Sequence, residues 1–247
     1  MSQLRLDKIL ADTGLYSRRE VAVLISQGRV VVSGELAKSG ACKYDPGAVD
    51  IKIDGNTVNY TKFHYIVMNK PAGYISSTFD RNERTVLELL DDKYTKLGIF
   101  PVGRLDKDAE GLLLLTNDGD FAHRITSPSK NVKKRYFVVF DGEVTDNDIM
   151  TFKQGLVLAD GTRCLPAKLE ATEGGAFVTV VEGKYHQVKR MMVAIGKPVL
   201  YLKRISIGGM ILDEMLKTGE FRELTSDDCK SIILDKYGQS KKNSYKK

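Results

Sequence analysis

The sequence predicts an α+β protein with a small N-terminal domain, residues 1–59, and a larger domain, residues 60–237, built on a mixed, largely antiparallel sheet. In the first domain, two short helical periodicities come before short strand patterns. In the second, strand-like runs follow one another with only scattered helical segments between them. This order lacks the regular strand–helix alternation of a doubly wound fold, so antiparallel pairing is favoured.

The first domain begins with two predicted helices. Apolar residues at helical spacing start at Leu6 and stop at Gly14. Ser17 and Glu20 have the spacing of a capping box, which predicts the start of a second helix, and Gly28 ends it. A polar stretch, residues 59–62, predicts a linker to the second domain. Two short strands are expected between these features, at Val30–Val32 and Asp50–Asp54.

The second domain consists mainly of predicted strands. Apolar or alternating runs between Gly, Pro and Asn turn residues predict strands at Tyr65–Asn69, Gly111–Thr116, Tyr136–Phe140, Pro166–Ala171, Ala176–Val181 and Val199–Ile207. Helical periodicity predicts helices at Thr85–Leu90, Asp120–Ile125, Thr145–Lys153, His186–Ala194 and Ser226–Leu234.

The composition excludes several classes of protein. With 42% hydrophobic and 28% charged residues, the chain is neither disordered nor collagen-like. No window approaches 18 consecutive apolar residues, and the first residues are charged too early for a secretion signal, so no membrane association is expected. The cysteines form no disulfide or CxxC pattern, which is typical of a reducing cytoplasm. They are Cys42, Cys164 and Cys229.

The net charge of +6 is concentrated at the C-terminus. Residues 236–247 carry five lysines and no acidic residue, whereas residues 61–235 carry equal numbers of each sign. The polar, basic segment 238–247 predicts a disordered tail. Its charge is consistent with an RNA-binding arm and equally with a solvated tail, and the sequence leaves both open.

No pattern predicts a metal or a cofactor. His64, His123 and His186 are isolated from one another and from the cysteines. No glycine-rich loop between a strand and a helix offers a cradle for nucleotide phosphates. Asp106 and Asp108 form a short carboxylate pair, but a pattern of three residues occurs often by chance.

Three segments of the second domain hold the candidate functional residues. The first is an Arg-Leu-Asp loop that ends at Asp106, just before a predicted buried strand; alone, such an aspartate is usually a turn former. The second, Lys134-Arg-Tyr136, puts an aromatic ring beside basic residues, which is also consistent with core packing. The third, Glu182–Met191, begins at the end of a strand and continues into a helix. Taken alone, the cations of this helix indicate a solvated face. Those cations are Lys184, Lys189 and Arg190.

In this order and spacing, the three segments resemble the pseudouridine synthases that modify single uridines in ribosomal RNA, the family named for its small-subunit enzyme. The resemblance extends from about Leu4 to Leu234. Residues 4–58 resemble the S-four (alpha-L) RNA-binding domain, except that Ser33 stands where the family often has asparagine. The matching motifs there are Arg5–Lys8, Gly14, Ser17–Arg19 and Gly28–Val30, and those of the catalytic domain are Met68–Gly73, Gly103–Asp106, Lys134–Tyr136 and Gly183–Arg190.

The resemblance implies an isomerisation without a cofactor. The glycosidic bond of a uridine breaks, the base rotates, and it is reattached through carbon 5. By position, Asp106 is the catalytic carboxylate, Tyr136 stacks on the target base, and Lys189 pairs with Asp106. Whether Asp106 attacks the sugar, attacks the base or removes a sugar proton stays open. The residues expected to bind RNA are Arg104, which fills the gap left by the extruded nucleotide, and Lys134, Lys184, Arg190, Arg18, Arg19 and Arg29.

The expected partner is ribosomal RNA, acted on by a monomer in the cytoplasm. Asp80–Leu87 and His123–Pro128 resemble the branch that acts on 16S rRNA more than the large-subunit branches. A 23S rRNA enzyme and a catalytically silent RNA-binding assembly factor remain alternatives. A uridine methyltransferase is disfavoured because no cysteine lies in a matching context. A glycosidase is disfavoured because Asp106 and Asp108 share one loop, whereas its two carboxyl groups must flank a bond at ~5–9.5 Å.

Overall fold

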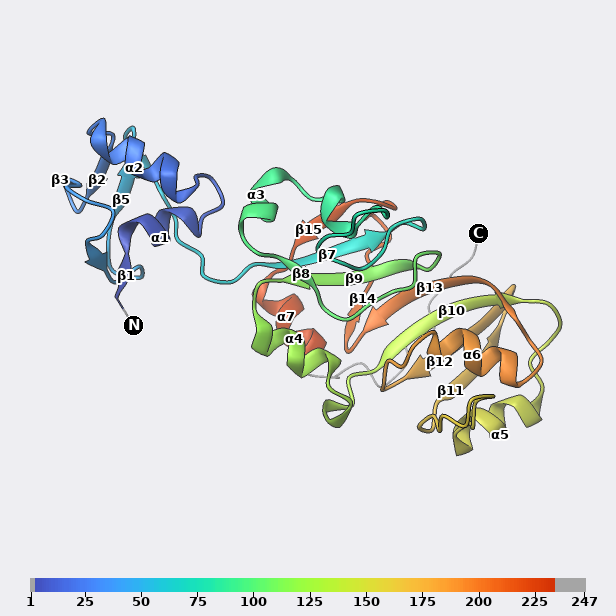
Figure 1. The fold of residues 1–247 in the computed structure, drawn as a ribbon. Coiled ribbons are helices and arrows are strands. Elements are labelled where there is room, and N and C mark those ends of the chain that lie inside the picture. Colours follow the sequence, from blue (N-terminus) through green and yellow to red (C-terminus); the bar gives the residue numbers. More distant parts are fainter. Residues whose placement is uncertain (1–2, 234–247) are drawn as a thin grey trace. The chain divides into compact units, whose positions relative to one another are not determined.

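The computed structural model describes residues 3–233, and the chain divides into two compact units (Figure 1). The first contains the residues up to His64 together with Leu90–Ile99, and the second contains Tyr65–Leu89 and the residues from Phe100 onward. Helices and sheets occur in both units, which confirms the predicted α+β class. The predicted tail, residues 238–247, lies outside the described residues.

The first unit has the two predicted helices, α1 (Leu6–Ala11) and α2 (Arg18–Ser26). The capping box of α2 is present: the Glu20 N–H donates to Ser17 Oγ at 3.2 Å, and the Ser17 N–H donates to the Glu20 carboxylate at 2.6 Å. The strands form a four-stranded sheet in the order β3-β2-β5-β6 and a two-stranded sheet, β1-β4. Their bounds are β1 (Leu4–Arg5), β2 (Val30–Val32), β3 (Glu35–Leu36), β4 (Lys43–Tyr44), β5 (Ile51–Ile53) and β6 (Asn56–Thr57).

A two-residue turn, Ser33-Gly34, joins β2 to β3. Val32 pairs with Glu35 directly across it, and φ is +51° at Ser33 and +88° at Gly34. Two positive φ angles are the geometry of a type I′ hairpin turn, in which asparagine followed by glycine is preferred. Serine tolerates this left-handed conformation less well than asparagine does, so Ser33 carries backbone strain.

The predicted helix Thr85–Leu90 is only partly present. Val86–Leu89 forms a short 3-10 helix, η1, and a separate helix, α3 (Asp92–Lys96), was not predicted and belongs to the first unit. Gly14 accounts for this attachment: its φ is +76°, and a Cβ atom there would lie 2.6 Å from the Lys93 carbonyl oxygen. The absence of a side chain at Gly14 therefore lets the turn after α1 pack directly against α3.

The second unit is built on a nine-stranded sheet in the order β11-β12-β10-β13-β9-β7-β15, with β8 paired to β9 and β14 paired to β13. All six predicted strands are present, as β7 (Tyr65–Lys70), β9 (Glu110–Thr116), β10 (Lys134–Phe140), β11 (Lys168–Thr172), β12 (Gly175–Val180) and β13 (Val199–Ile207). The short strands β8 (Phe100–Pro101), β14 (Met210–Ile211) and β15 (Phe221–Glu223) were not predicted. Most pairs are antiparallel, which confirms the mixed, largely antiparallel sheet.

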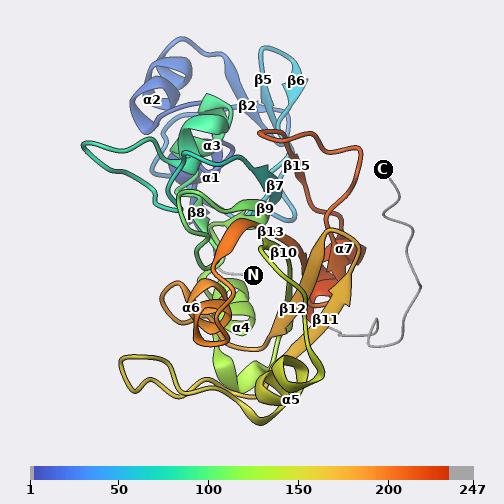
Figure 2. The same cartoon turned by 90° about the vertical axis from the view of Figure 1, so that its right-hand side faces the viewer.

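The helices of the second unit lie close to their predicted positions. They are α4 (Gly119–Thr126), α5 (Asp146–Gln154), α6 (Gln187–Ala194) and α7 (Ser226–Ile233), with a 3-10 helix, η2 (Pro128–Lys130), after α4. Helix α5 packs against β11, α4 contacts α7, and α6 packs against β13, beside which it appears in Figure 2. An apolar cluster that includes Val67, Leu114, Phe121 and Ile232 ties α4 and α7 to the sheet.

One parallel pairing, β13 with β9, joins the strands β11-β12-β10-β13 to the strands β9-β7-β15. It consists of two residue pairs, Lys203 with Glu110 and Arg204 with Gly111. A Cβ atom at position 111 would lie 2.2 Å from the Arg204 carbonyl oxygen, so only glycine permits this approach. Because β9 directly follows the loop that carries Asp106, the pairing brings that loop close to β10 and β13.

Candidate active site

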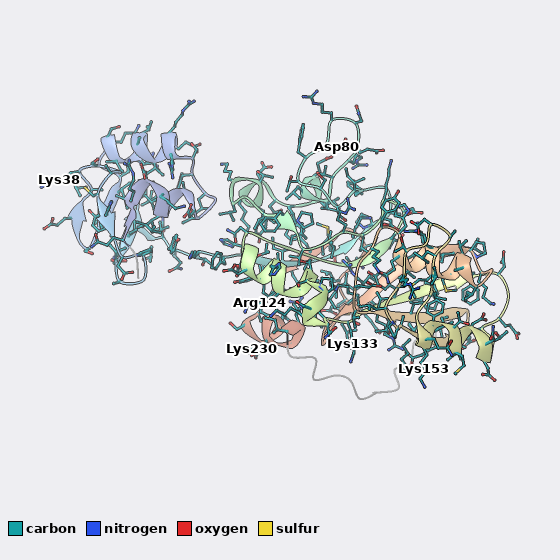
Figure 3. The ribbon with its side chains drawn as sticks, turned by 60° about the horizontal axis from the view of Figure 1, so that its bottom comes forward. Lys38, Asp80, Arg124, Lys133, Lys153 and Lys230 are labelled. Atoms are coloured by element: carbon teal, nitrogen blue, oxygen red, sulfur yellow. The ribbon has the colours of Figure 1, made fainter. Side chains whose placement is uncertain are left out.

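A cavity of about 550 Å³ lies in the second unit, where segments far apart in the sequence meet. Its floor consists of buried side chains of the sheet, chiefly Lys134 and Tyr136 of β10 and Arg204 of β13. Its rim is formed by loops that carry Ile75–Ser77, Asp80 (labelled in Figure 3), Gly103–Lys107 and Glu182–Val188. Of the predicted site residues, the cavity is lined by Asp106, Tyr136, Arg104, Lys134 and Lys184.

Asp106 lies at the rim, on the loop between β8 and β9, with its side chain 21% exposed. Its Oδ1 is 3.6 Å from His186 Nε2, and its Oδ2 is 3.8 Å from Lys189 Nζ. Lys189 is closer to Asp108, at 2.6 Å from each carboxylate oxygen, and this hydrogen bond lowers the pKa of Asp108 below its usual value. Lys189 therefore lies near both carboxylates, and its hydrogen bonds go to Asp108.

The buried ammonium of Lys70 fixes the Asp106 loop from beneath. Lys70 is 0% exposed, and its Nζ lies between 2.7 and 3.3 Å from the carbonyl oxygens of Pro71, Asp106, Lys107 and Ala109. Burial lowers the pKa of Lys70 to about 8, although nearby carboxylates oppose this shift. This role of Lys70 was not predicted: the residue lies in the motif Met68–Gly73, directly after a predicted strand, and no local pattern shows which carbonyl oxygens its ammonium meets.

Further hydrogen bonds hold the same loop from the side. Ser76 Oγ donates to the Leu105 carbonyl oxygen and accepts from the Leu105 N–H, both at 3.0 Å. The Gly73 N–H donates to the Lys107 carbonyl oxygen at 2.7 Å. Since these contacts come from backbone or buried groups, the position of Asp106 is fixed before any ligand binds.

Tyr136 and Arg204 face each other across neighbouring strands on the cavity floor. They are paired residues of β10 and β13, and Arg204 Nη1 lies 3.4 Å from the Tyr136 hydroxyl oxygen. The Arg204 Nε also donates to the Leu112 carbonyl oxygen at 2.7 Å. Arg204 was not predicted as a site residue, because it lies within the apolar run of a predicted strand. A single arginine at a buried strand position is the signal that the sequence offers.

The loop before α6 carries the rim cation Lys184, and α6 itself carries Arg190, which does not line the cavity. Glu182 is 5% exposed, accepts a hydrogen bond from Gln187 at 2.8 Å and forms an ion pair with Lys184 at 3.0 Å. Arg190 forms an ion pair with Asp160 at 2.5 Å. His186, at the start of α6, has a positive φ of +46° and stacks on Tyr185 with ring centroids 3.9 Å apart.

The remaining predicted RNA-binding residues belong to the first unit. Arg18 and Arg19 are exposed at the start of α2. Arg29 is exposed as well, but its guanidinium donates two hydrogen bonds to Asp54, at 2.8 and 2.5 Å. Arg18 and Arg19 are therefore the better placed of the three to meet an anionic partner.

Two family models match the chain. A model described as RNA pseudouridylate synthase covers residues 64–194, which include the whole Asp106 loop, Tyr136 and Lys189. The chain belongs to the RNA pseudouridylate synthase family. The S4 domain model matches residues 4–50 of this pseudouridine synthase, in agreement with the resemblance of its first domain.

Full-length relatives agree with this assignment. An uncharacterised RNA pseudouridine synthase of Bacillus subtilis is 43% identical over 91% of this chain and 96% of its own length. The ribosomal small subunit pseudouridine synthase A of Escherichia coli is 40% identical over 93% of this chain and 100% of its own length. A crystal structure of a pseudouridylate synthase, 35% identical over 93% of this chain and 99% of its own, superposes with a TM-score of 0.65.

The described part of the pseudouridine synthase has no candidate metal site. Residues 3–233 contain no cluster of three or more histidine, cysteine or acidic side chains arranged to hold an ion. Its cysteines, Cys42, Cys164 and Cys229, are free thiols. None of the helices in the described range is long and apolar enough to cross a membrane.

Proposed function

We propose that this pseudouridine synthase isomerises one uridine of small-subunit (16S) ribosomal RNA without a cofactor, with Asp106 as its catalytic carboxylate. One observation carries the proposal: Asp106 is held at the rim of a cavity whose floor presents the ring of Tyr136. Relatives named small-subunit enzymes, 39–40% identical over 93% of this chain, support ribosomal RNA as the substrate.

The target uridine must first leave its stack, which costs roughly a few kcal/mol. Tyr136, 8% exposed on the floor, offers a face on which the extruded base stacks. Arg104, exposed at the rim, fills the position that the nucleotide vacates in the RNA. Both interactions offset the cost of extrusion and bring the C1′ atom of the ribose toward the carboxylate.

The chemistry then needs no group beyond those of the chain and its substrate. The bond between C1′ and N1 breaks, the base turns, and a bond forms between C1′ and C5. The C5 proton leaves and N1 gains one, so product and substrate are isomers. Asp106 promotes this exchange at the ribose or the base, and Lys189, 3.8 Å away, supplies the compensating positive charge.

The first domain, residues 1–59, contributes affinity, and residues 60–237 carry the chemistry. The exposed Arg18 and Arg19 bind phosphates, which positions the RNA without reading its sequence. A single chain supplies every residue named here, so a monomer suffices. Its free thiols are suited to the cytoplasm, where a reducing environment keeps them unpaired.

The test is release of tritium from 16S rRNA transcripts that carry [5-³H]uridine, because isomerisation expels the C5 hydrogen into water. We expect release with the full chain and none with Asp106→Asn. Release from 23S rRNA alone would make the protein a large-subunit enzyme. Tight binding of rRNA without any release would make it an RNA-binding assembly factor.

A further inference from the structure

The side chain of Arg204 is buried with part of its guanidinium unused. The residue is 2% exposed and lines the cavity. Its Nε donates to the Leu112 carbonyl oxygen, and its Nη1 lies near the Tyr136 hydroxyl. Its Nη2 is buried and has no hydrogen-bond partner within residues 3–233. Because an unmade hydrogen bond of a buried charged group is costly, the vacant donor indicates a ligand.

Lys134 adds a second buried cation to the same floor. It is 7% exposed, and its ammonium donates one hydrogen bond, to the Val132 carbonyl oxygen at 3.1 Å. Burial and the neighbouring charge of Arg204 lower the pKa of Lys134 to about 8. In the described part of the chain, no carboxylate forms an ion pair with Lys134 or Arg204.

The carboxylates around the cavity are committed elsewhere. Asp106 and Asp108 face Lys189, and Glu182 accepts from Gln187 and pairs with Lys184. Asp80, at the rim, accepts hydrogen bonds from the N–H groups of Asn82 and Glu83. Two positive charges buried side by side are costly, and a negative charge bound between them offsets that cost. Within the described residues, the cavity floor therefore has two cations without a partner anion, and the substrate must supply the negative charge.

Depth distinguishes the phosphate of a nucleotide, which is always negatively charged, from the base, which becomes negative only while it is detached. A nucleotide flipped out of a stack enters a pocket base first, with its phosphates left near the mouth. The cations at the mouth, such as Arg104, are exposed, whereas Arg204 and Lys134 belong to the sheet beneath, next to Tyr136. The floor pair consequently meets the base rather than the backbone.

We propose that Arg204 and Lys134 bind the carbonyl oxygens of the uracil while it is detached and stabilise its negative charge, an inference that rests on the proposed function. When the C1′–N1 bond breaks, its electron pair remains on the ring, and the charge is shared between N1 and the carbonyl oxygens. Cations that are already in place in a dry cavity stabilise such a charge strongly. The charge disappears when an electron pair of the ring forms the C1′–C5 bond; the C5 proton then leaves and N1 is protonated.

The decisive variant is Lys134→Met. Replacement of Arg204 is less informative, because the Arg204 side chain also donates to the backbone of β9 and its loss would disturb the sheet. The matched control is Lys133→Met, one residue earlier, which is exposed (Figure 3) and does not line the cavity. Single-turnover rates at saturating enzyme and RNA dissociation constants are measured for both full-length variants and the unmodified chain. We expect Lys134→Met to slow the saturating rate on the order of 100-fold while RNA affinity is unchanged, and Lys133→Met to change neither.

A second substrate separates charge stabilisation from packing. Fluorine at C5 withdraws electrons and stabilises the detached base by itself, so the defect of Lys134→Met should shrink on RNA that carries 5-fluorouridine. C5 carries no proton in this substrate, so after the C1′–C5 bond forms the ring keeps its fluorine and takes up water across N1 and C6. The reaction is followed by nuclease digestion and the loss of the 5-fluorouridine nucleoside.

Each alternative has its own result. A weaker RNA affinity with a normal saturating rate would show that the pair binds a phosphate, and an equal defect on both substrates would show a packing role; either overturns the inference. No conversion of any rRNA by the unmodified chain would instead overturn the proposed function and the inference with it.

Discussion

The ammonium of Lys189 lies 3.8 Å from the Asp106 carboxylate, just outside hydrogen-bonding distance. The same ammonium contacts Asp108 at 2.6 Å, so two carboxylates share one cation. The Asp108 side chain is 73% exposed and that of Asp106 is 21% exposed. Water screens the Asp108 contact and makes it weak. Asp106, the more buried carboxylate, lines the cavity and Asp108 does not, which supports the proposed role of Asp106.

Exchange of each aspartate for asparagine separates their roles. Asp106→Asn keeps the shape of the side chain and removes its charge, so we expect folding and RNA binding to survive and tritium release to fall below detection. Asp108→Asn should keep substantial activity, because Lys189 is then free to pair with Asp106 alone. Initial rates on 16S rRNA transcripts test both. Loss of activity in Asp108→Asn with retention in Asp106→Asn would mean that the wrong carboxylate was assigned.

Lys70→Met should impair catalysis although Lys70 does not line the cavity. Methionine fills the space but leaves the carbonyl oxygens of the Asp106 loop without their donor, which we expect to cost about 1–3 kcal/mol of unfolding free energy. The loop should also open more often. Hydrogen exchange of the Ala109 amide, which donates to the Asp106 carbonyl oxygen, reports on this opening. Unchanged exchange and full activity would refute the anchoring role.

Lys134→Met should raise stability, the reverse of its effect on activity. The pKa of Lys134 is about 8 in the folded chain against 10.5 when unfolded, so below pH 8 the folded state carries the full cost of a buried charge. We expect the variant to gain on the order of 1–3 kcal/mol of unfolding free energy at neutral pH. Between about pH 8 and pH 10.5 the folded wild type loses its proton first, so this gain should shrink. Urea denaturation at several pH values measures the difference; a variant less stable at neutral pH contradicts the prediction.

Replacement of Arg18 and Arg19 together by alanine should weaken RNA binding without slowing the saturated reaction. Both side chains are exposed at the start of α2 and lie in the unit without Asp106. Each lost phosphate contact should reduce the slope of log affinity against log salt concentration by about 0.7–0.9. Filter binding across a salt series measures the slope. An unaltered slope would show that these arginines do not touch the RNA backbone.

Ser33→Asn should stabilise the first unit. The substitution places a residue that accepts positive φ at the first central position of a type I′ turn, where φ is +51°. We expect a gain of roughly 0.5 kcal/mol or less, within the range of other turn substitutions. Thermal unfolding of the full chain detects the change, and Ser33→Ala, which lacks this preference, should produce no gain.

Helices and strands with a clear periodic pattern could be predicted from the sequence. Elements that are fixed by contacts between distant segments could not. Six strands and most helices were recognisable because alternation or helical spacing extends over at least five residues in each. Helix α3 has five residues and is fixed by Gly14, a contact that no local pattern contains. The same limit applies to the site: Asp106 and Tyr136 stand in recognisable motifs. Arg204 joins them only through the pairing of β13 with β9 and β10, which periodicity does not reveal.

The two-residue parallel pairing at Gly111 has a mechanical consequence. Asp106 precedes β9 on one half of the sheet, whereas Tyr136 and Arg204 lie on the other half, so the joint between the halves sets the distance from carboxylate to ring. A small change in the angle at this joint moves the reacting groups relative to one another and leaves each half internally intact. The side chains around the cavity can thus stay the same while their spacing changes at this hinge-like junction.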